Sequence, residues 1–263
     1  MKTPYLRNVI LIALLVVCSQ VQAATTTLLS DTFEGGVMTN WTGNGFNITA
    51  NPATTSTTGS NTSTNVLETP GGTSRTVTII SKSTAVTSSM GESLQLSLQF
   101  DVSAADTYWN SHWYLLNGTS ANSSSGYGFK LSGSTFEIDM IVNGVSTVLV
   151  SVSGLSSILD TTGWNTVEFT WAVDGTLTLE VNDQTVLQTT DTSITTAFAA
   201  LYSVDFLNNS STASGKVLYF DNIEVTAVPE PKAGALLGIG AFLGLAFFHR
   251  KCAIRRREKS AQA

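Results

Sequence analysis

The stretch Leu94–Phe100 reads Leu-Gln-Leu-Ser-Leu-Gln-Phe, an apolar residue alternating with a polar one at every position. This period of two places all four apolar side chains on one face of a β-strand and the polar ones on the other. The same alternation recurs in residues 76–79, 167–171, 177–181 and 217–225. We therefore expect half-buried strands at these places.

Turn signals separate the strands. Asn117-Gly118, Asn143-Gly144 and Asp174-Gly175 are dipeptides that favour tight hairpins. Residues 51–65 hold no apolar side chain larger than Ala or Pro, which indicates a long loop. No sustained helical period occurs in residues 24–228. We predict an all-β fold there, a two-sheet antiparallel sandwich of the jelly-roll kind with about a dozen strands.

The charge and the cysteines of the 263-residue chain are unevenly distributed. Residues 24–228 carry four Lys or Arg against seventeen Asp or Glu. Such an acidic region has no basic stripe with which to bind phosphates, so we exclude nucleic acid as a partner. Both cysteines, Cys18 and Cys252, lie outside it, which excludes a disulfide framework, a cysteine-ligated zinc site and a cysteine nucleophile.

The N-terminal end is typical of a secretory signal peptide. Two basic residues precede an apolar run over residues 9–17, and Val21 and Ala23 fit a signal-peptidase site. Lipoprotein processing at Cys18 is the alternative, but Val17 before it is bulkier than that processing prefers. We therefore expect signal peptidase to remove residues 1–23.

The C-terminal end reads as a membrane anchor with a defined orientation. After Pro229-Glu230-Pro231 comes an apolar run over residues 233–248, followed by a basic tail. The run is just short of the ~20 residues of a usual transmembrane helix, and flanking Lys or Arg side chains can snorkel to extend it. Because basic flanks stay in the cytoplasm, residues 24–228 are expected outside the cytoplasmic membrane.

Residues 229–259 also resemble the PEP-CTERM sorting signal of Gram-negative bacteria. The Pro229, Glu230 and Pro231 tripeptide, the short span and the arginine-rich end occur in the expected order. The resemblance implies an inner-membrane-anchored precursor that an exosortase processes near the tripeptide and releases to the cell surface or extracellular matrix. It also implies an association with exopolysaccharide and biofilm. A plain membrane anchor is the alternative.

A second resemblance covers the central region. Residues 31–36 with Trp41, residues 126–129 and residues 220–225 resemble concanavalin A-like, laminin-G-like sandwiches. The resemblance implies that the first and last strands pair side by side and bring the ends of the domain together.

The densest aromatic segment, residues 108–114, is the candidate ligand site. As a strand it would place Trp109, Ser111, Trp113 and Leu115 on a core face. The opposite face would form a candidate glycan-binding strip of Tyr108, Asn110, His112 and Tyr114, mixing rings with an amide and a histidine. The alternative is that both faces are packed inside the protein.

Residues 137–140, Glu-Ile-Asp-Met, resemble the start of the catalytic strand of β-glucanase-like hydrolases. That family implies a second glutamate two or three residues after the aspartate, where this chain has Ile141 or Val142. Glycoside hydrolysis needs two carboxyl groups, so we assign no catalytic residue and expect a non-enzyme. Glu137 and Asp139 are then expected on the solvent side of an ordinary strand.

Four acids form a candidate calcium site. Pairing of the terminal strands would bring Asp31 or Glu34 near Asp221 or Glu224, and calcium binds such oxygen ligands. Many carbohydrate modules of the resembled fold hold a structural calcium at such a position. The alternative is that these acids belong to an acidic surface.

The sequence thus predicts a secreted, exosortase-processed surface or matrix protein whose sandwich binds polysaccharide. The expected partners are signal peptidase, exosortase, the membrane before processing, and polysaccharide. Two alternatives stay open, a glycan-active hydrolase of the concanavalin A-like fold and a purely structural matrix protein without a ligand.

Overall fold

The computed structural model describes residues 25–38, 40–44, 46–52, 61–69, 75–81, 92–102, 109–132, 135–154, 157–207 and 217–229. The predicted signal peptide, residues 1–23, and the predicted transmembrane helix, residues 233–248, lie outside these ranges. In the ranges themselves, no helix is long and apolar enough to span a membrane. Residues 25–228 form one compact unit, which is described below.

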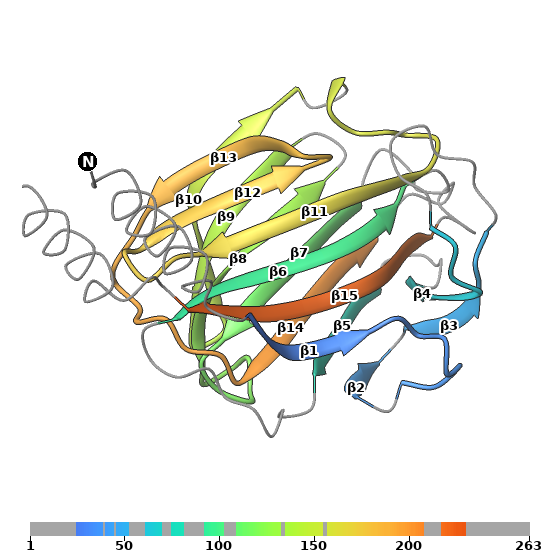
Figure 1. Cartoon of the computed structure of the whole chain (residues 1–263), viewed down its shortest axis with the longest axis horizontal. Coiled ribbons are helices and arrows are strands. Elements are labelled where there is room, and N and C mark those ends of the chain that lie inside the picture. The colour runs from blue at the N-terminus through green and yellow to red at the C-terminus, as the bar shows by residue number, and fades with distance from the viewer. Residues whose placement is uncertain are drawn as a thin grey trace, which may run out of the picture. The chain divides into compact units, whose positions relative to one another are not determined.

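Two antiparallel sheets make up this unit (Figure 1). The sheet that we call the β6 sheet has the order β13-β12-β11-β6-β15-β4-β3, with β1 also paired to β15. Its strands are β1 (Thr26–Asp31), β3 (Asn47–Ala50), β4 (Asn65–Thr69), β6 (Glu92–Asp101), β11 (Trp164–Trp171), β12 (Thr176–Val181), β13 (Gln184–Thr190) and β15 (Leu218–Pro229).

The second sheet, which we call the β7 sheet, has the order β10-β9-β8-β7-β14-β5-β2. Its strands are β2 (Trp41–Asn44), β5 (Arg75–Ser81), β7 (Trp109–Leu116), β8 (Ser125–Ser132), β9 (Thr135–Val142), β10 (Val145–Ser153) and β14 (Ala200–Leu207). The regular elements described are all strands, so the predicted all-β, two-sheet antiparallel sandwich is confirmed.

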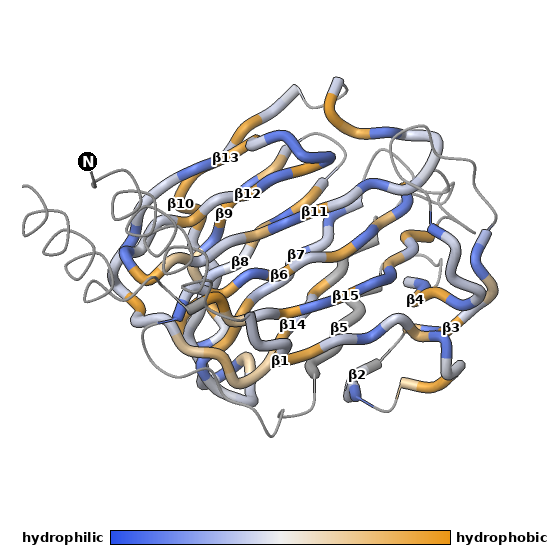
Figure 2. The backbone as a smooth tube through the Cα atoms, in the orientation of Figure 1, coloured by the Kyte–Doolittle hydropathy of each residue, from blue (hydrophilic) through white to orange (hydrophobic). Residues whose placement is uncertain are grey.

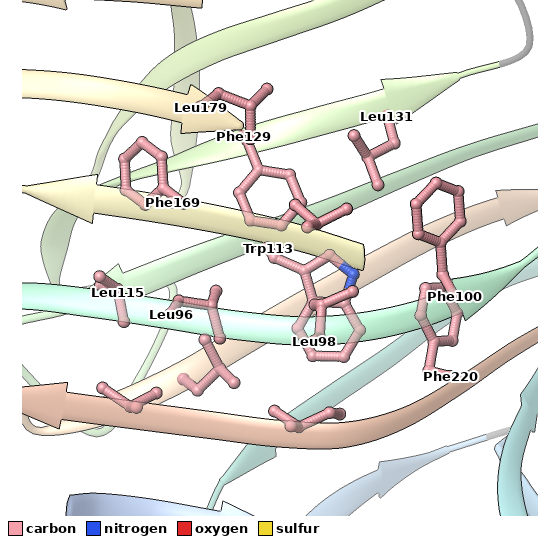
Figure 3. Close-up of a cluster of buried hydrophobic side chains, with 14 of the residues drawn as sticks. Leu96, Leu98, Phe100, Trp113, Leu115, Phe129, Leu131, Phe169, Leu179 and Phe220 are labelled. Carbon is pink, nitrogen blue, oxygen red and sulfur yellow. The ribbon is translucent and has the colours of Figure 1, made fainter. Parts of the chain in front are cut away.

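Alternating burial explains why the two sheets pack face to face. Along β6 the four apolar side chains of residues 94–100 are at most 2% exposed, whereas the glutamines and serine between them are half-buried. Figure 2 shows the same alternation of hydrophobic and hydrophilic residues along the strands. Side chains from both sheets meet between them (Figure 3), and each fully buried one contributes about 1.5–3 kcal/mol.

The predicted pairing of the first and last strands is confirmed. β1 runs antiparallel to β15, with Thr26 opposite Ala227 and Ser30 opposite Glu224 (Figure 1). Both ends of the domain therefore lie in the β6 sheet.

Two of the three predicted tight turns are present. Asn143 and Gly144 both have positive φ, and so does Gly175, as tight hairpins require. Asn117-Gly118 is different, because β7 ends at Leu116 and β8 begins only at Ser125. The tight hairpin expected at this dipeptide is wrong. Instead, the Asn117 side chain accepts a hydrogen bond from the Ser125 backbone and closes a longer loop.

β8 approaches β7 so closely that Gly128 has no room for a side chain. A Cβ atom added at Gly128 would lie 1.9 Å from the carbonyl oxygen of Trp113. At Gly35, by contrast, the nearest atom to an added Cβ would be 3.9 Å away. Close contact with a backbone atom cannot be relieved by a side-chain rotation.

Gly128→Ala is therefore expected to lower the free energy of unfolding by at least about 2 kcal/mol, because the two strands must separate. Gly35→Ala is the control and should change it by less than about 0.5 kcal/mol. Urea denaturation of both variants measures the difference. Equal stability of the two variants would contradict the close approach of β8 to β7.

Candidate functional site

The two faces of β7 divide as the sequence predicts. Trp109, Trp113 and Leu115 belong to the main core, and the Trp113 indole nitrogen donates to the Ser111 hydroxyl at 2.8 Å. Successive side chains of a strand point to opposite sides, so the even-numbered residues lie on the outer face of the β7 sheet. These are Asn110, His112 and Tyr114. Tyr108, the fourth member of the predicted strip, lies outside the described residues.

The strand register adds residues of β8 and β9 to this outer face. His112 lies opposite Lys130, which in turn lies opposite Glu137. In the next row, Tyr114 lies opposite Gly128 and Gly128 opposite Asp139. Sequence reasoning did not connect these residues, because the pairing of strands is not visible in a single strand's pattern.

Asp139 contacts two hydroxyl groups. Its Oδ2 lies 3.2 Å from the Tyr114 hydroxyl and accepts from the Ser146 hydroxyl of β10 at 3.0 Å. The Asp139 side chain is only 1% exposed, and its Oδ1 has no hydrogen-bond partner among the described residues. The expectation that Asp139 faces solvent is therefore wrong. In β8, which lies between β7 and β9, Gly128 has no side chain that would separate Tyr114 from Asp139.

Tyr114 connects Asp139 to the histidine. Its hydroxyl lies 3.0 Å from His112 Nδ1, and that nitrogen lies 3.6 Å from Asp139 Oδ2. Burial raises the pKa of Tyr114 above its ordinary value, Ser146 acts in the opposite direction, and the charge of Asp139 raises the pKa further. The hydroxyl therefore stays protonated and serves as a donor at neutral pH.

An ion pair borders this network. The Lys130 ammonium donates to Glu137 Oε1 at 3.0 Å and to Oε2 at 3.1 Å. The two side chains are 21% and 14% exposed, and that of His112 is 15% exposed. The accessible part of the site is thus His112, Lys130 and Glu137, which we call the charged strip. Tyr114 is 2% exposed and therefore positions its neighbours rather than presenting a ring to a ligand.

Tyr114→Phe is expected to cost about 1–3 kcal/mol of unfolding free energy, because it removes one of the two hydroxyls that contact the buried Asp139 carboxylate. Tyr202 supplies a matched control, since its ring lies 6.3 Å from that of Tyr114 and the structure shows no hydrogen bond from its hydroxyl to a described residue. Tyr202→Phe should cost less than about 0.5 kcal/mol. Guanidinium denaturation of the pair tests this, and a similar loss in both variants would argue against the network.

Two of the four acids of the predicted calcium site, Asp31 and Glu224, lie apart from each other. Asp31 Oδ1 and Oδ2 accept from the Phe33 backbone and the Trp41 indole, each at 2.8 Å. Glu224 accepts from the Thr27 hydroxyl at 3.0 Å. Asp31 lies opposite Ile223, a core residue, so the side chains of Asp31 and Glu224 project to opposite faces of the β6 sheet.

Glu34 and Asp221, in contrast, lie near each other. The charge of Glu34 is one of the influences that raise the pKa of Asp221. Glu34 Oε1 accepts from the backbone of Thr64 at 2.6 Å, and Asp221 Oδ2 accepts from Asn61 Nδ2 at 2.7 Å. Nowhere in the described part of the chain do three His, Cys, Asp or Glu side chains converge as metal ligands would.

The outer face of the β6 sheet carries a shallow acidic hollow of about 500 Å³. Glu168, Glu180, Asp183 and Glu224 line it together with uncharged residues. Glu180 and Glu224 are already bonded to threonine hydroxyls. This face is chemically unlike the charged strip, since its lining has acids but no base.

The sandwich is similar to solved lectin-like structures. It superposes on the Emp47p carbohydrate recognition domain with a TM-score of 0.55 and 10% identity, covering 76% of this chain and 94% of that one. The fold is concanavalin A-like. A second similar structure, the globular domain of T. cruzi calreticulin, gives a TM-score of 0.54 and 12% identity over 84% of this chain and 95% of that one. Identities this low establish the concanavalin A-like fold alone.

No family model matches the sequence, and no curated protein matches it. The PEP-CTERM resemblance therefore stays a prediction. Of its motif, Pro229 is the last residue of β15, and Glu230 and Pro231 lie outside the described residues.

Proposed function

We propose that residues 24–228 form a polysaccharide-binding domain of a secreted, exosortase-processed surface protein, and that the charged strip on the outer face of the β7 sheet binds the glycan. The observation that carries this proposal is the strip itself. It is the partly exposed row of His112, Lys130 and Glu137 on a concanavalin A-like sandwich. The similarity to a structure whose title names a carbohydrate recognition domain is consistent with it.

The chemistry of the strip suits sugar hydroxyls. Lys130 supplies donors, Glu137 supplies acceptors, and the His112 ring can do either according to its protonation. In the neighbouring row of the same face, Tyr114, Asp139 and Ser146 are held in place by hydrogen bonds of 3.0–3.2 Å. Polar groups that are already ordered lose little entropy on binding, which favours affinity.

The residues of β9 support a domain that binds a glycan without cleaving it. The strand that carries Glu137 and Asp139 has Ile141 and Val142 where the resembled hydrolases have their second glutamate. Both Glu137 oxygens also lie within 3.1 Å of the Lys130 ammonium. A pair of carboxyl groups with separate acid and nucleophile or base roles is needed for glycoside cleavage.

Retention of the full chain, kept in mild detergent, on a panel of immobilised polysaccharides tests the binding. Neutral, uronic-acid and amino-sugar polymers should be included. We expect at least one polymer to retain the chain, and His112→Ala and Glu137→Gln to weaken that retention about tenfold or more. Glu168→Gln, on the outer face of the other sheet, is the matched control and should bind normally. No retention on any polymer would favour the purely structural alternative, and release of reducing ends would favour the hydrolase.

Delivery to the surface is a separate part of the proposal, supported by the sequence of the two ends. In a Gram-negative host with an exosortase, we expect the mature chain outside the cytoplasmic membrane and without its basic tail. Replacing Pro229, Glu230 and Pro231 with alanines should leave the chain in the inner-membrane fraction with the tail intact. Fractionation followed by mass spectrometry of the C-terminus measures both. Equal release of the altered chain would show that the tripeptide is not a sorting signal.

A further inference from the structure

One edge of the β7 sheet is open along β10. Among the described strands, β10 pairs only with β9 (Figure 1). Proteins usually protect a sheet edge with a short strand, a charge or a proline. The other strands at the ends of the two sheets are either only four residues long, as β2 and β3 are, or expose glutamines and threonines, as β13 does. β10 has nine residues and, in Val145–Ser153, no charge and no proline.

The first half of β10 is the accessible part of this edge. Val145 lies opposite Val142 and Val148 lies opposite Asp139, in regular register. All residues from Val145 to Val148 are exposed. The register shifts after Val148, and the apolar residues beyond it pack against the core. We call residues 145–148 the open edge.

Apolar side chains lie on both faces of the open edge. Val148 is on the outer face with Asp139, and Val145, three positions earlier, is on the opposite face. Their exposed fractions are 51% and 67%, and that of Val142 is 37%. These three valines are the majority of the five exposed large hydrophobic residues in the described part of the chain. A strand added here would cover apolar surface on each face and pair with the backbone of β10.

A second copy of the same chain fits this edge. Residues 24–228 carry seventeen acids against four bases, so two copies repel each other over most of their surface. Residues 140–159 contain no charged side chain, so two open edges approach each other with less repulsion. A basic partner would be attracted to the acids elsewhere on the domain. Antiparallel pairing also suits identical edges, because a twofold axis makes each one the complement of the other.

We propose that two copies of this chain associate by antiparallel pairing of their open edges. The two β7 sheets then form one continuous sheet. Residues that lie opposite each other in paired strands are on the same face, so the outer faces of both copies, with their charged strips, lie on the same side. A polysaccharide that reaches both strips would bind bivalently. This last consequence rests on the proposed glycan binding, whereas the pairing itself does not.

Sedimentation equilibrium of the full chain in a density-matched mild detergent tests the pairing. We expect the average mass to rise with concentration from that of one chain to that of two. Val145→Lys and Val148→Lys place like charges at the joined edges, and each should raise the dissociation constant of the dimer at least about tenfold. Both positions are exposed, so the domain should still fold, and near-ultraviolet circular dichroism checks this.

Val173→Lys is the matched control, because Val173 is a valine exposed to 41% in the turn between β11 and β12. It lowers the net negative charge as much as the other two variants do and should leave the dimer unchanged. Weakening by either edge lysine, with the control unchanged, supports the pairing. A chain that stays single at every concentration would overturn it and leave the edge to a strand of another protein. A dimer that both edge lysines leave intact, or that Val173→Lys weakens equally, would overturn it too, since a different surface would then hold the copies together.

Discussion

Packing of Trp113 against Phe220 connects the two sheets, and much of the structure depends on it. The rings come from β7 and β15 and meet edge to face with centroids 5.2 Å apart, and both side chains are fully buried. Because alternate residues of a strand face opposite sides, Trp113 in the core fixes His112 and Tyr114 on the outer face. In β15 the alternation is broken, because Phe220 and Ile223 both lie in the core and Asp221 lies at the bulge between them. A slip of one residue in β7 would therefore move His112 off the outer face and break the core contact as well.

The two buried carboxylates of these sites differ in how their charge is compensated. Asp139 contacts two hydroxyls, and the His112 ring nitrogen lies 3.6 Å from its Oδ2. Asp221 contacts amides and has Glu34 as its charged neighbour. Among the described residues, no basic side chain forms an ion pair with Asp221. Both carboxylates nevertheless keep one oxygen, Oδ1, without a hydrogen-bond partner among the described residues.

The features that could be predicted from the sequence are those that depend on the alternation within a single strand. Alternation along residues 94–100 and along β7 predicted both the sandwich and the two faces of β7 correctly, because burial follows the period of two. The burial of Asp139 was not predictable in this way. It depends on Gly128 in the adjacent strand, which leaves space for Tyr114, and on Ser146 in the strand beyond. The Lys130–Glu137 pair likewise exists only because β8 and β9 are in register.

The bulge in β15 explains why the acids expected at a calcium site separate. Pairing of β1 with β15 places Asp31 near the last strand, as the sequence predicted, but pairing alone does not determine which face a side chain occupies. The extra residue between Phe220 and Ile223 changes the alternation, and Glu224 then lies opposite Ser30 on the outer face. The buried apolar positions shift from Leu218 and Phe220 to Ile223 and Val225, and Asn222 between them has a φ of 49°. The residues that contact Asp221 instead come from the segment between β3 and β4, which has no strand period from which its position could be inferred.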